Sequence, residues 1–165
     1  MRVSIITSCY NRAATIRSAI ESVLAQDYND IEFIVVDGSS TDGSLDIIRE
    51  YADRISIIIS EPDHGMYEAI NKGIRVATGE IIGLLHSDDF FYDNGVVGRI
   101  VERMKRTHAD FLYGDGLFVN PDDTNKVVRN WSWGRVSSLE SASWMASSSS
   151  HLLYTTRCND ETGAL

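Results

Sequence analysis

The stretch Glu80-Ile81-Ile82-Gly83-Leu84-Leu85-His86-Ser87-Asp88-Asp89 runs from an almost wholly apolar segment directly into two adjacent carboxylates. An apolar run of this length, bounded by a glycine and an acidic turn, is typical of a strand buried on both faces at the centre of a parallel sheet. Neighbouring carboxylates repel each other and lose hydration on burial, and a bound cation would offset both costs. The stretch therefore predicts that Asp88 and Asp89 hold a divalent metal against the phosphates of a nucleotide.

The composition favours one folded domain with an acidic surface. The chain has 165 residues, of which 43% are hydrophobic, and this is enough for one sizeable core. Its formal charge is −9, from 24 acidic and 15 basic residues, and no basic stripe stands out. These features exclude a nucleic-acid binder and disfavour tight unaided docking on an anionic membrane.

The cysteines and the N-terminal residues indicate in which cellular compartment the protein is expected. Cys9 and Cys158 are far apart and have no CxxC partner, which disfavours a structural zinc site and leaves one long-range disulfide open. The apolar run at residues 3–7 is too short for a signal peptide or a membrane span. We expect a soluble cytoplasmic protein, at most peripheral at the inner face of the membrane.

Strand and helix patterns alternate four times along the chain. Because such alternation produces right-handed crossovers, it predicts an α/β fold, a Rossmann-like, doubly wound and mostly parallel sheet with helices on both faces. Asn11 is predicted to cap the first helix, Gly79 to close the third, and Asp93 or Asn94 to cap the fourth. The expected strands are residues 3–7, 31–37, 55–60 and 80–85, and the expected helices are residues 12–26, 45–51, 66–77 and 97–104.

The pattern weakens after the fourth helix. Residues 109–119 and 126–131 read as two strands around a turn at 121–123, which predicts a hairpin added as a mixed edge of the sheet. Residues 132–165 are serine-rich and have no clean period. We therefore expect a domain at 1–131, incomplete at its C-terminus, followed by a poorly patterned tail.

Ligands bind beyond the carboxyl ends of the strands in doubly wound sheets, where the strand order reverses. Residues 8–11, 37–39 and 87–89 follow strands one, two and four and are expected to line one crevice. There Tyr10 offers a ring on which a base can stack, and Asp37 can accept from an N–H of a pyrimidine. No GxGxxG or GxxxxGK[ST] follows the first strand, which disfavours a dinucleotide site and a P-loop.

Each of these residues also has a simpler interpretation. The acidic pair can be only a turn and helix cap, Tyr10 a packing aromatic, and Asp37 the cap of the turn after its strand. Packing is favoured over metal binding for His86 and over reactivity for Cys9. His64 is as readily a solvated loop residue, and Asp115 reads equally as a turn or a site residue.

Three blocks of sequence resemble the family 2 glycosyltransferases, which are inverting enzymes with the GT-A fold that use nucleotide-diphosphate sugars. The blocks are VSIITSCYNR at 3–12, VVDGSSTDGS at 35–44 and ATGEIIGLLHSDD at 77–89. Their order and spacing match the family over roughly residues 1–131. Residues 63–69 resemble a subgroup associated with bacterial polysaccharide assembly. The resemblance implies transfer of a sugar, from a UDP-sugar in our reading, to a saccharide or lipid-linked acceptor in cell-surface polysaccharide synthesis.

The resemblance also implies roles for single residues. Ser8 and Tyr10 flank the nucleoside beside Asn11, and Asp37 contacts the base. Asn71 lies near the donor and Asp88 near the ribose or diphosphate. Asp89 is the metal-contacting acid of a DxD-like motif, with Asp88 beside it, and the metal is Mn²⁺ or Mg²⁺.

The family's acceptor-activating carboxylate lies in the second half of its domain, and no acidic pair in a comparable context follows here. Asp160 and Glu161 fall in the tail without a sequence pattern, and we do not assign either of them as this base. The catalytic base therefore stays unknown. The alternative is a non-catalytic nucleotide-sugar-binding remnant or a chain too damaged to fold stably. A nucleotidyltransferase would need a Gly-rich, basic loop after the first strand, which residues 8–11 do not provide.

The tail predicts a shift of reading frame near Met145 and a premature end. Codons exist for residues 146–157 that, read one nucleotide later, spell Pro-Pro-His-Pro-His-Thr-Phe-Phe-Ile-Arg-Arg, similar to a segment that the family places here. Sequencing the gene across Met145 tests this hypothesis. We expect a downstream frame that continues the family pattern, and a gene without one would refute the idea.

Overall fold

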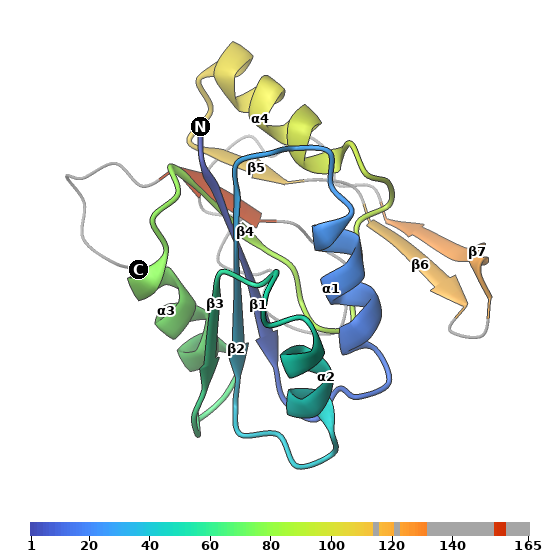
Figure 1. Cartoon of the computed structure of the whole chain (residues 1–165). Coiled ribbons are helices and arrows are strands. Elements are labelled where there is room, and N and C mark those ends of the chain that lie inside the picture. Colours follow the sequence, from blue (N-terminus) through green and yellow to red (C-terminus); the bar gives the residue numbers. More distant parts are fainter. Residues whose placement is uncertain (114–115, 121–122, 132–153, 158–165) are drawn as a thin grey trace.

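The computed structural model describes residues 1–113, 116–120, 123–131 and 154–157 of the chain (Figure 1). It contains a six-stranded sheet in the order β3-β2-β1-β4-β8-β5 and a separate two-stranded sheet of β6 and β7. The strands are β1 (Val3–Cys9), β2 (Ile31–Asp37), β3 (Ile57–Ser60), β4 (Ile81–Leu84), β5 (Phe111–Tyr113), β6 (Gly116–Asn120), β7 (Asp123–Trp131) and β8 (Tyr154–Arg157). The helices are α1 (Ile16–Leu24), α2 (Ser44–Glu50), α3 (Met66–Val76) and α4 (Val96–Thr107).

The first four strands are parallel, which confirms the predicted α/β architecture. β1 pairs with β2 on one side and with β4 on the other, and β2 pairs with β3. The chain therefore moves outward through β2 and β3 and returns through α3 to place β4 against the free edge of β1. The strand order reverses between β1 and β4, and this reversal fixes where the sheet can open a crevice.

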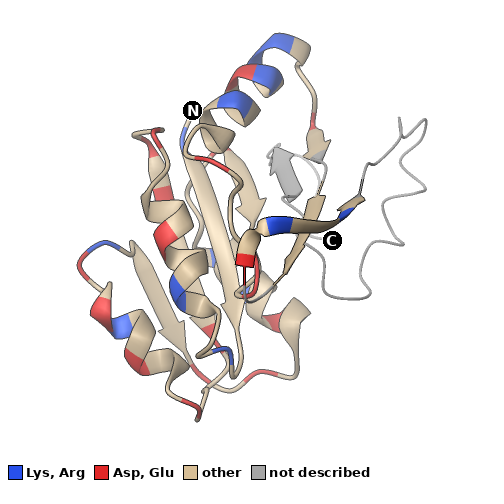
Figure 2. Cartoon of the chain, turned by 90° about the vertical axis from the view of Figure 1, so that its right-hand side faces the viewer, with Lys and Arg blue, Asp and Glu red and all other residues tan. Residues whose placement is uncertain are grey.

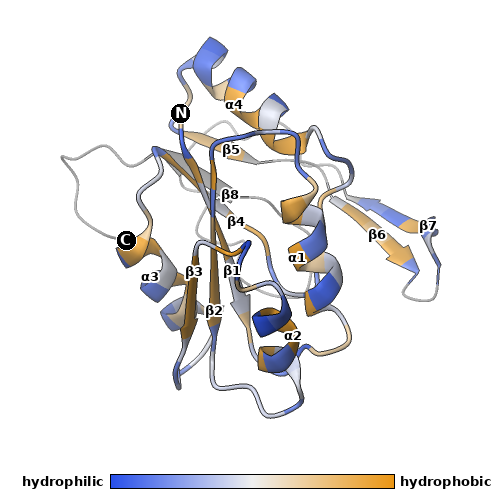
Figure 3. Cartoon of the chain, in the orientation of Figure 1, coloured by the Kyte–Doolittle hydropathy of each residue, from blue (hydrophilic) through white to orange (hydrophobic). Residues whose placement is uncertain are grey.

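Helices cover both faces of the parallel strands (Figures 1 and 3). Successive strand side chains point to opposite faces, so Ile5 and Phe33 pack against one helical layer and Ile6 and Ile34 against the other. The first layer contains α1, α2 and α4, whereas α3 covers the second through Ala69. The β-branched runs of β1 and β2 are buried on both sides, as the sequence predicts.

A buried carboxylate ties the strands together at the amino end of the sheet. Glu32 on β2 is 4% exposed and accepts hydrogen bonds from the Ser4 hydroxyl and from both the backbone N–H and hydroxyl of Thr78, the latter two at 2.7 Å. The Arg2 guanidinium lies 3.5 Å from the same carboxylate. Burial alone raises the pKa of Glu32, but these hydrogen bonds and the Arg2 charge outweigh it and lower the pKa.

Gly79 belongs to this network and does not close α3. The helix ends at Val76 with Ala77 in an extended conformation as its C-cap, so the predicted cap is wrong. The Gly79 N–H instead donates to the Ser4 hydroxyl at 2.8 Å. A Cβ at Gly79 would lie 2.6 Å from the Ser4 backbone nitrogen, so this crossing requires glycine.

The predicted N-caps are also wrong. α1 begins at Ile16 after a turn, with Thr15 as its N-cap, because the Asn11 side chain accepts a hydrogen bond from Thr41 in another loop. α4 begins after Gly95. Asp93 lies two residues before Gly95 and accepts from its N–H, while also pairing with Arg99 at 2.9 Å.

The last strands depart from the sequence pattern. The expected strand at 109–119 is two strands, because β5 joins the large sheet while β6 pairs with β7. The hairpin is therefore confirmed, but its place at the edge of the large sheet is wrong. The antiparallel member is β8, inserted between β4 and β5 from a segment without a strand pattern. The serine-rich run lies outside the described residues, and the domain boundary at 131 stays a prediction.

Basic residues recur along α4, although the chain as a whole has a net negative charge (Figure 2). Lys105 and Arg106 occupy its last turn, where cations interact favourably with the helix dipole. In the part of the chain that the structure describes, no helix has the length and apolar character needed to cross a bilayer.

Glu32→Gln should destabilise the fold by about 1–3 kcal/mol at pH 7, because it leaves buried donors poorly satisfied. The folded-state pKa is lowered, so the stabilisation is complete above the unfolded value of about 4.3 and is lost as pH falls through the folded pKa. Urea unfolding between pH 3 and 7 measures this difference. The control is Glu50→Gln, an exposed partner of Arg17, and a Glu32 effect that is equal at both pH limits would contradict the account.

Candidate functional site

The carboxyl ends of β1, β2 and β4 lie at one edge of the sheet. Cys9 is in register with Asp37 on β2, and Ile6 is in register with Leu84 on β4. The Leu85 N–H donates to the Ile6 carbonyl at 3.0 Å, which keeps the chain beside β1 beyond the end of β4. The structure therefore brings the three predicted loops to the edge where the strand order reverses.

The loops after β1 and β2 are joined by direct hydrogen bonds. The Gly38 N–H donates to the Cys9 carbonyl at 2.9 Å. Asn11 receives the Thr41 N–H on its Oδ1 and donates its own N–H to the Ser40 hydroxyl, both at 2.9 Å. Asn11 has φ 51°, a left-handed conformation that Asn tolerates better than most residues. Two further bonds run from Arg12 to Ser44 and from Ala13 to Asp42.

Asp37 holds the turn that follows β2. It is fully buried, and its Oδ2 accepts from the Ser40 N–H at 3.1 Å and from the Ser60 hydroxyl at 2.8 Å. The turn role that the sequence left open is therefore present in the structure. The predicted contact of Asp37 with a base stays a prediction.

Tyr10 and Ser8 differ in exposure. The Tyr10 residue is 61% exposed just past β1, so the interpretation of this residue as a packing aromatic is wrong. Its ring is available for stacking with a ligand at this edge. Ser8 is 8% exposed and lies within β1, opposite Val36.

The acidic pair sits in a turn just beyond β4. The Asp89 N–H donates to the His86 carbonyl at 3.0 Å, Asp89 is 2% exposed, and Asp88 is half-buried. Among the described residues, no group of three or more His, Cys, Asp or Glu side chains is arranged so that it could hold a metal ion. Two carboxylates nevertheless fit Mg²⁺ or a similar hard cation, which is commonly held by one or two carboxylates together with substrate phosphates.

Asn71 and Cys9 lie on regular elements. Asn71 is exposed on α3, away from the three loops in sequence. Cys9 is 3% exposed, and burial followed by the charge of Asp37 raises the pKa of its thiol to about 11. A thiol in this state is protonated at neutral pH, which supports packing as its role. Asp115 lies outside the described residues.

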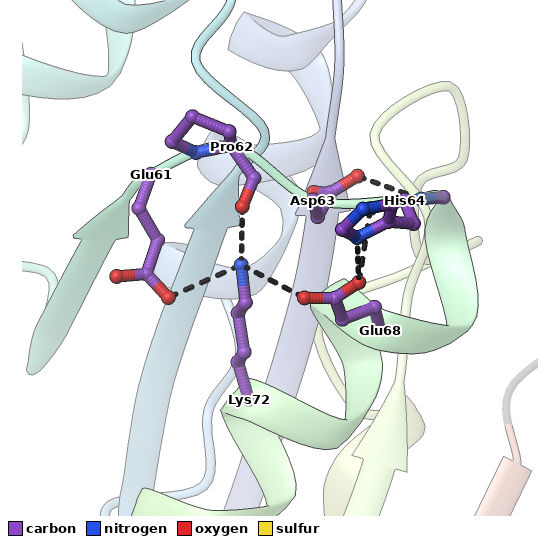
Figure 4. Close-up of polar contacts among 7 residues, drawn as sticks. Glu61, Pro62, Asp63, His64, Glu68 and Lys72 are labelled. Carbon is purple, nitrogen blue, oxygen red and sulfur yellow. Dashed lines mark hydrogen bonds and ion pairs between the residues drawn. The ribbon is translucent and has the colours of Figure 1, made fainter.

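A fourth loop at this edge, between β3 and α3, was missed as part of the site. Its Asp63 carboxylate lies so close to Gly38 that a Cβ there would be 2.6 Å from Asp63 Oδ2. Lys72 on α3 holds the loop through the Pro62 carbonyl at 2.8 Å and Glu61 at 3.1 Å (Figure 4). The sequence contained a signal for including this loop in the site, because residues 61–63 directly follow a parallel strand, as the other three loops do.

His64 in this loop is solvated and paired. Its side chain is 96% exposed, and its Nδ1 lies 2.8 Å from Glu68 Oε2. The Glu68 pKa is lowered, first by the hydrogen bond from the His64 N–H and then by the imidazole. The open exposure supports the solvated role that the sequence allowed.

A family model and curated relatives match this chain. The model described as "Glycosyl transferase family 2" covers residues 4–158. A PGL/p-HBAD biosynthesis glycosyltransferase of Mycobacterium bovis is 34% identical over 116 residues, which are 68% of this chain and 45% of the relative. The UDP-Glc:alpha-D-GlcNAc-diphosphoundecaprenol beta-1,3-glucosyltransferase WfgD of Escherichia coli is 33% identical over 141 residues, 78% of this chain and 55% of that protein. The chain spans about half the length of these relatives.

Solved structures superpose on a large part of this chain. TarS of S. aureus in complex with UDP-GlcNAc superposes with a TM-score of 0.63 at 25% identity, over 67% of this chain and 33% of TarS. The mannosyltransferase PcManGT from Pyrobaculum calidifontis, in complex with GDP-Man and Mn²⁺, gives a TM-score of 0.63 at 26% identity. That match covers 75% of this chain and 37% of PcManGT. The predicted GT-A fold is confirmed.

The Asn11 bridge can be tested by two substitutions. Asn11→Gly should cost about 1 kcal/mol of unfolding free energy through the lost hydrogen bond. Asn11→Ala should cost roughly 1 kcal/mol more, because alanine also resists the left-handed conformation. Urea denaturation measures both variants, and an alanine variant as stable as the glycine variant would contradict the assigned backbone conformation.

Proposed function

Because the chain belongs to glycosyl transferase family 2, we propose that it binds the donor in transfer of a sugar from a nucleotide diphosphate to an acceptor hydroxyl. The observation that carries the proposal is the placement of Asp88 and Asp89 at the reversal of strand order, at the same edge of the sheet as the exposed Tyr10. This is where open α/β sheets bind their ligands.

The nucleoside is proposed to lie along the loops after β1 and β2. Stacking on the exposed ring of Tyr10 would contribute about 1–3 kcal/mol. Ser8 and Tyr10 flank the nucleoside beside Asn11, and the bonds of Asn11 to the neighbouring loop keep this surface in place before binding. Asp37 is assigned to the base end, and its contact with the base would replace one of its bonds to Ser40 or Ser60. Asn71 is assigned a place near the donor.

Mn²⁺ or Mg²⁺ is proposed at the acidic pair, with Asp89 as the direct ligand and Asp88 toward the ribose or diphosphate. When bound, the cation supplies charge neutralisation for the diphosphate leaving group. The chain's own contribution is the turn from His86 to Asp89, which holds the Asp89 carboxylate in a buried position. Burial lowers the local dielectric and strengthens the attraction between carboxylate and cation.

The donor is proposed to be a UDP-sugar and the acceptor a saccharide or lipid-linked saccharide of a cell-surface polymer. The printed function of WfgD, a UDP-glucose-dependent transferase acting on a diphosphoundecaprenol-linked sugar, supports this choice. In an inverting reaction a carboxylate takes the proton of the acceptor hydroxyl during in-line attack on the anomeric carbon. Asp160 and Glu161, which the sequence did not favour as this base, lie outside the described residues.

Asp89→Asn should abolish the part of UDP binding that depends on Mn²⁺, lowering affinity at least tenfold, because a neutral amide is a weaker cation ligand. Calorimetry of UDP with and without Mn²⁺ measures the effect. The matched control is Asp53→Asn, an exposed aspartate in the turn after α2, which should behave like the wild type. Unchanged Mn²⁺-dependent binding by the Asp89 variant would refute the metal assignment.

Transfer is tested separately from binding. Radiolabelled UDP-sugar should be consumed by the wild-type chain, either by transfer to an added acceptor or by slow hydrolysis. Nucleotide binding without either reaction would favour the nucleotide-sugar-binding remnant over an enzyme. Absence of saturable UDP binding would refute both proposals.

A further inference from the structure

We propose that the hairpin of β6 and β7 docks the protein on an anionic lipid surface. Val128 enters the surface, and Lys126 and Arg129 on either side of it contact lipid phosphates. This surface lies outside the donor site, and its role does not depend on nucleotide binding. It gives a location to the peripheral membrane association that the sequence analysis allows.

The hairpin is a separate unit of the fold. Among the described strands, β6 and β7 pair only with each other, and they project away from the six-stranded sheet (Figure 1). Residues 123–130 of β7 are all exposed, whereas residues 117–120 of β6 are half-buried. An isolated two-stranded ribbon is only marginally stable in water, so contact with a surface would stabilise this one.

Two adjacent valines are exposed on β7. Val127 is 47% exposed and Val128 is 66% exposed. Val127 lies opposite Val119 and Arg129 opposite Phe118, so Val128 falls at an irregularity of the ladder and has no register partner on β6. Such bulges bend a strand and re-aim a side chain. The bulge therefore presents an apolar side chain to the outside of the hairpin.

The charges beside the valines select an anionic partner. Lys126 forms no ion pair in the described part of the chain, although the protein carries a net charge of −9. The Arg129 guanidinium lies 5.8 Å from the centre of the Phe118 ring. Asp123, the acidic residue described on this hairpin, is used locally, because its Oδ1 accepts from the Asn125 N–H at 3.2 Å. Charges are screened over about 8 Å at physiological salt, so the local cations outweigh the distant acidic residues.

A lipid surface fits this arrangement better than a small ligand. Sites for small molecules are concave, whereas a projecting ribbon is convex. Cations near an anionic bilayer are attracted to its phosphates, and long basic side chains keep their charge in the headgroup layer while an apolar neighbour enters it. The insertion is shallow, because the free edges of the ribbon must keep their backbone N–H and C=O groups hydrated.

The basic end of α4 fits this role less well than the hairpin. Lys105 lies in its last turn, but no large apolar side chain of α4 is exposed. This turn also lies at the amino end of the sheet, since Met104, Lys105 and His108 line one cavity with Met1. It is therefore far from the edge that carries the acidic pair.

The test is flotation of the full chain, without nucleotide, with two kinds of vesicle. The wild type should bind vesicles of equal parts phosphatidylcholine and phosphatidylglycerol, release them at high salt, and not bind pure phosphatidylcholine. Lys126→Glu should lower the affinity for the anionic vesicles at least about fivefold, because it replaces an attraction with a repulsion. Val128→Ser should lower it about fivefold through the lost apolar contact.

Matched controls lie on α3, where an exposed cation and an exposed valine are also neighbours. Arg75→Glu changes the net charge as Lys126→Glu does, and Val76→Ser matches Val128→Ser. Both controls should bind within about twofold of the wild type, since only charges within a Debye length of the lipid act on it. Thermal unfolding of the four variants checks that the fold is retained.

Several outcomes would overturn the inference. These are no binding of the wild type to anionic vesicles, equal losses in the α3 controls, or loss only when Lys105 and Arg106 are reversed to glutamate. A wild-type dimer that Val128→Ser dissociates, without vesicle binding, would instead assign the hairpin to contact between copies of the chain. Because no nucleotide is present, a negative result leaves the donor-binding proposal standing, and absence of UDP binding leaves this inference standing.

Discussion

The pairing of β4 with the side of β1 opposite β2 is the constraint on which the rest of the structure depends. It places β1 at the centre of the parallel strands and reverses the strand order beside it. In the order of the sheet, the chain continues from β1 to β2 on one side of this reversal and from β4 to β5 on the other, and a ligand can approach the backbone at such a reversal. An acidic turn in this place can meet a phosphate-bound cation, whereas the same two residues at the amino edge would meet the buried Glu32 network.

Polar side chains have different roles at the two ends of the sheet. At the amino end, Glu32 binds Ser4 and Thr78 in a closed set of buried hydrogen bonds that fixes the crossing from α3 into β4. At the carboxyl end, polar groups stabilise loops instead: Asn11 joins the loops after β1 and β2, and Lys72 fastens the loop after β3. A stable amino end allows the opposite edge to carry the exposed Tyr10 and the two adjacent carboxylates Asp88 and Asp89.

Much of the fold can be predicted from local sequence, and the predictions that were wrong have identifiable physical causes. Apolar runs and helical periodicity locate the first four strands and the helices, because their burial is dictated by residues close in sequence. Asn11 was misassigned because asparagine favours both N-caps and left-handed turns, and only the bond to Thr41 decides between them. β8 has four residues and no alternation, so its pairing with β4 and β5 comes from long-range contacts. Asp63 was overlooked although the rule applied to the other three loops also covers the end of β3.

The most direct test of the central claim is a map of the backbone amides that respond to UDP and Mn²⁺, measured by NMR on the isotopically labelled chain. The account predicts shifts on UDP addition around Tyr10 and Gly38, and paramagnetic broadening by Mn²⁺ centred on Asp88 and Asp89. Amides of the Glu32 network at the amino end should stay unchanged. Responses centred on that end of the sheet or on α4, with the acidic turn unaffected, would contradict the account.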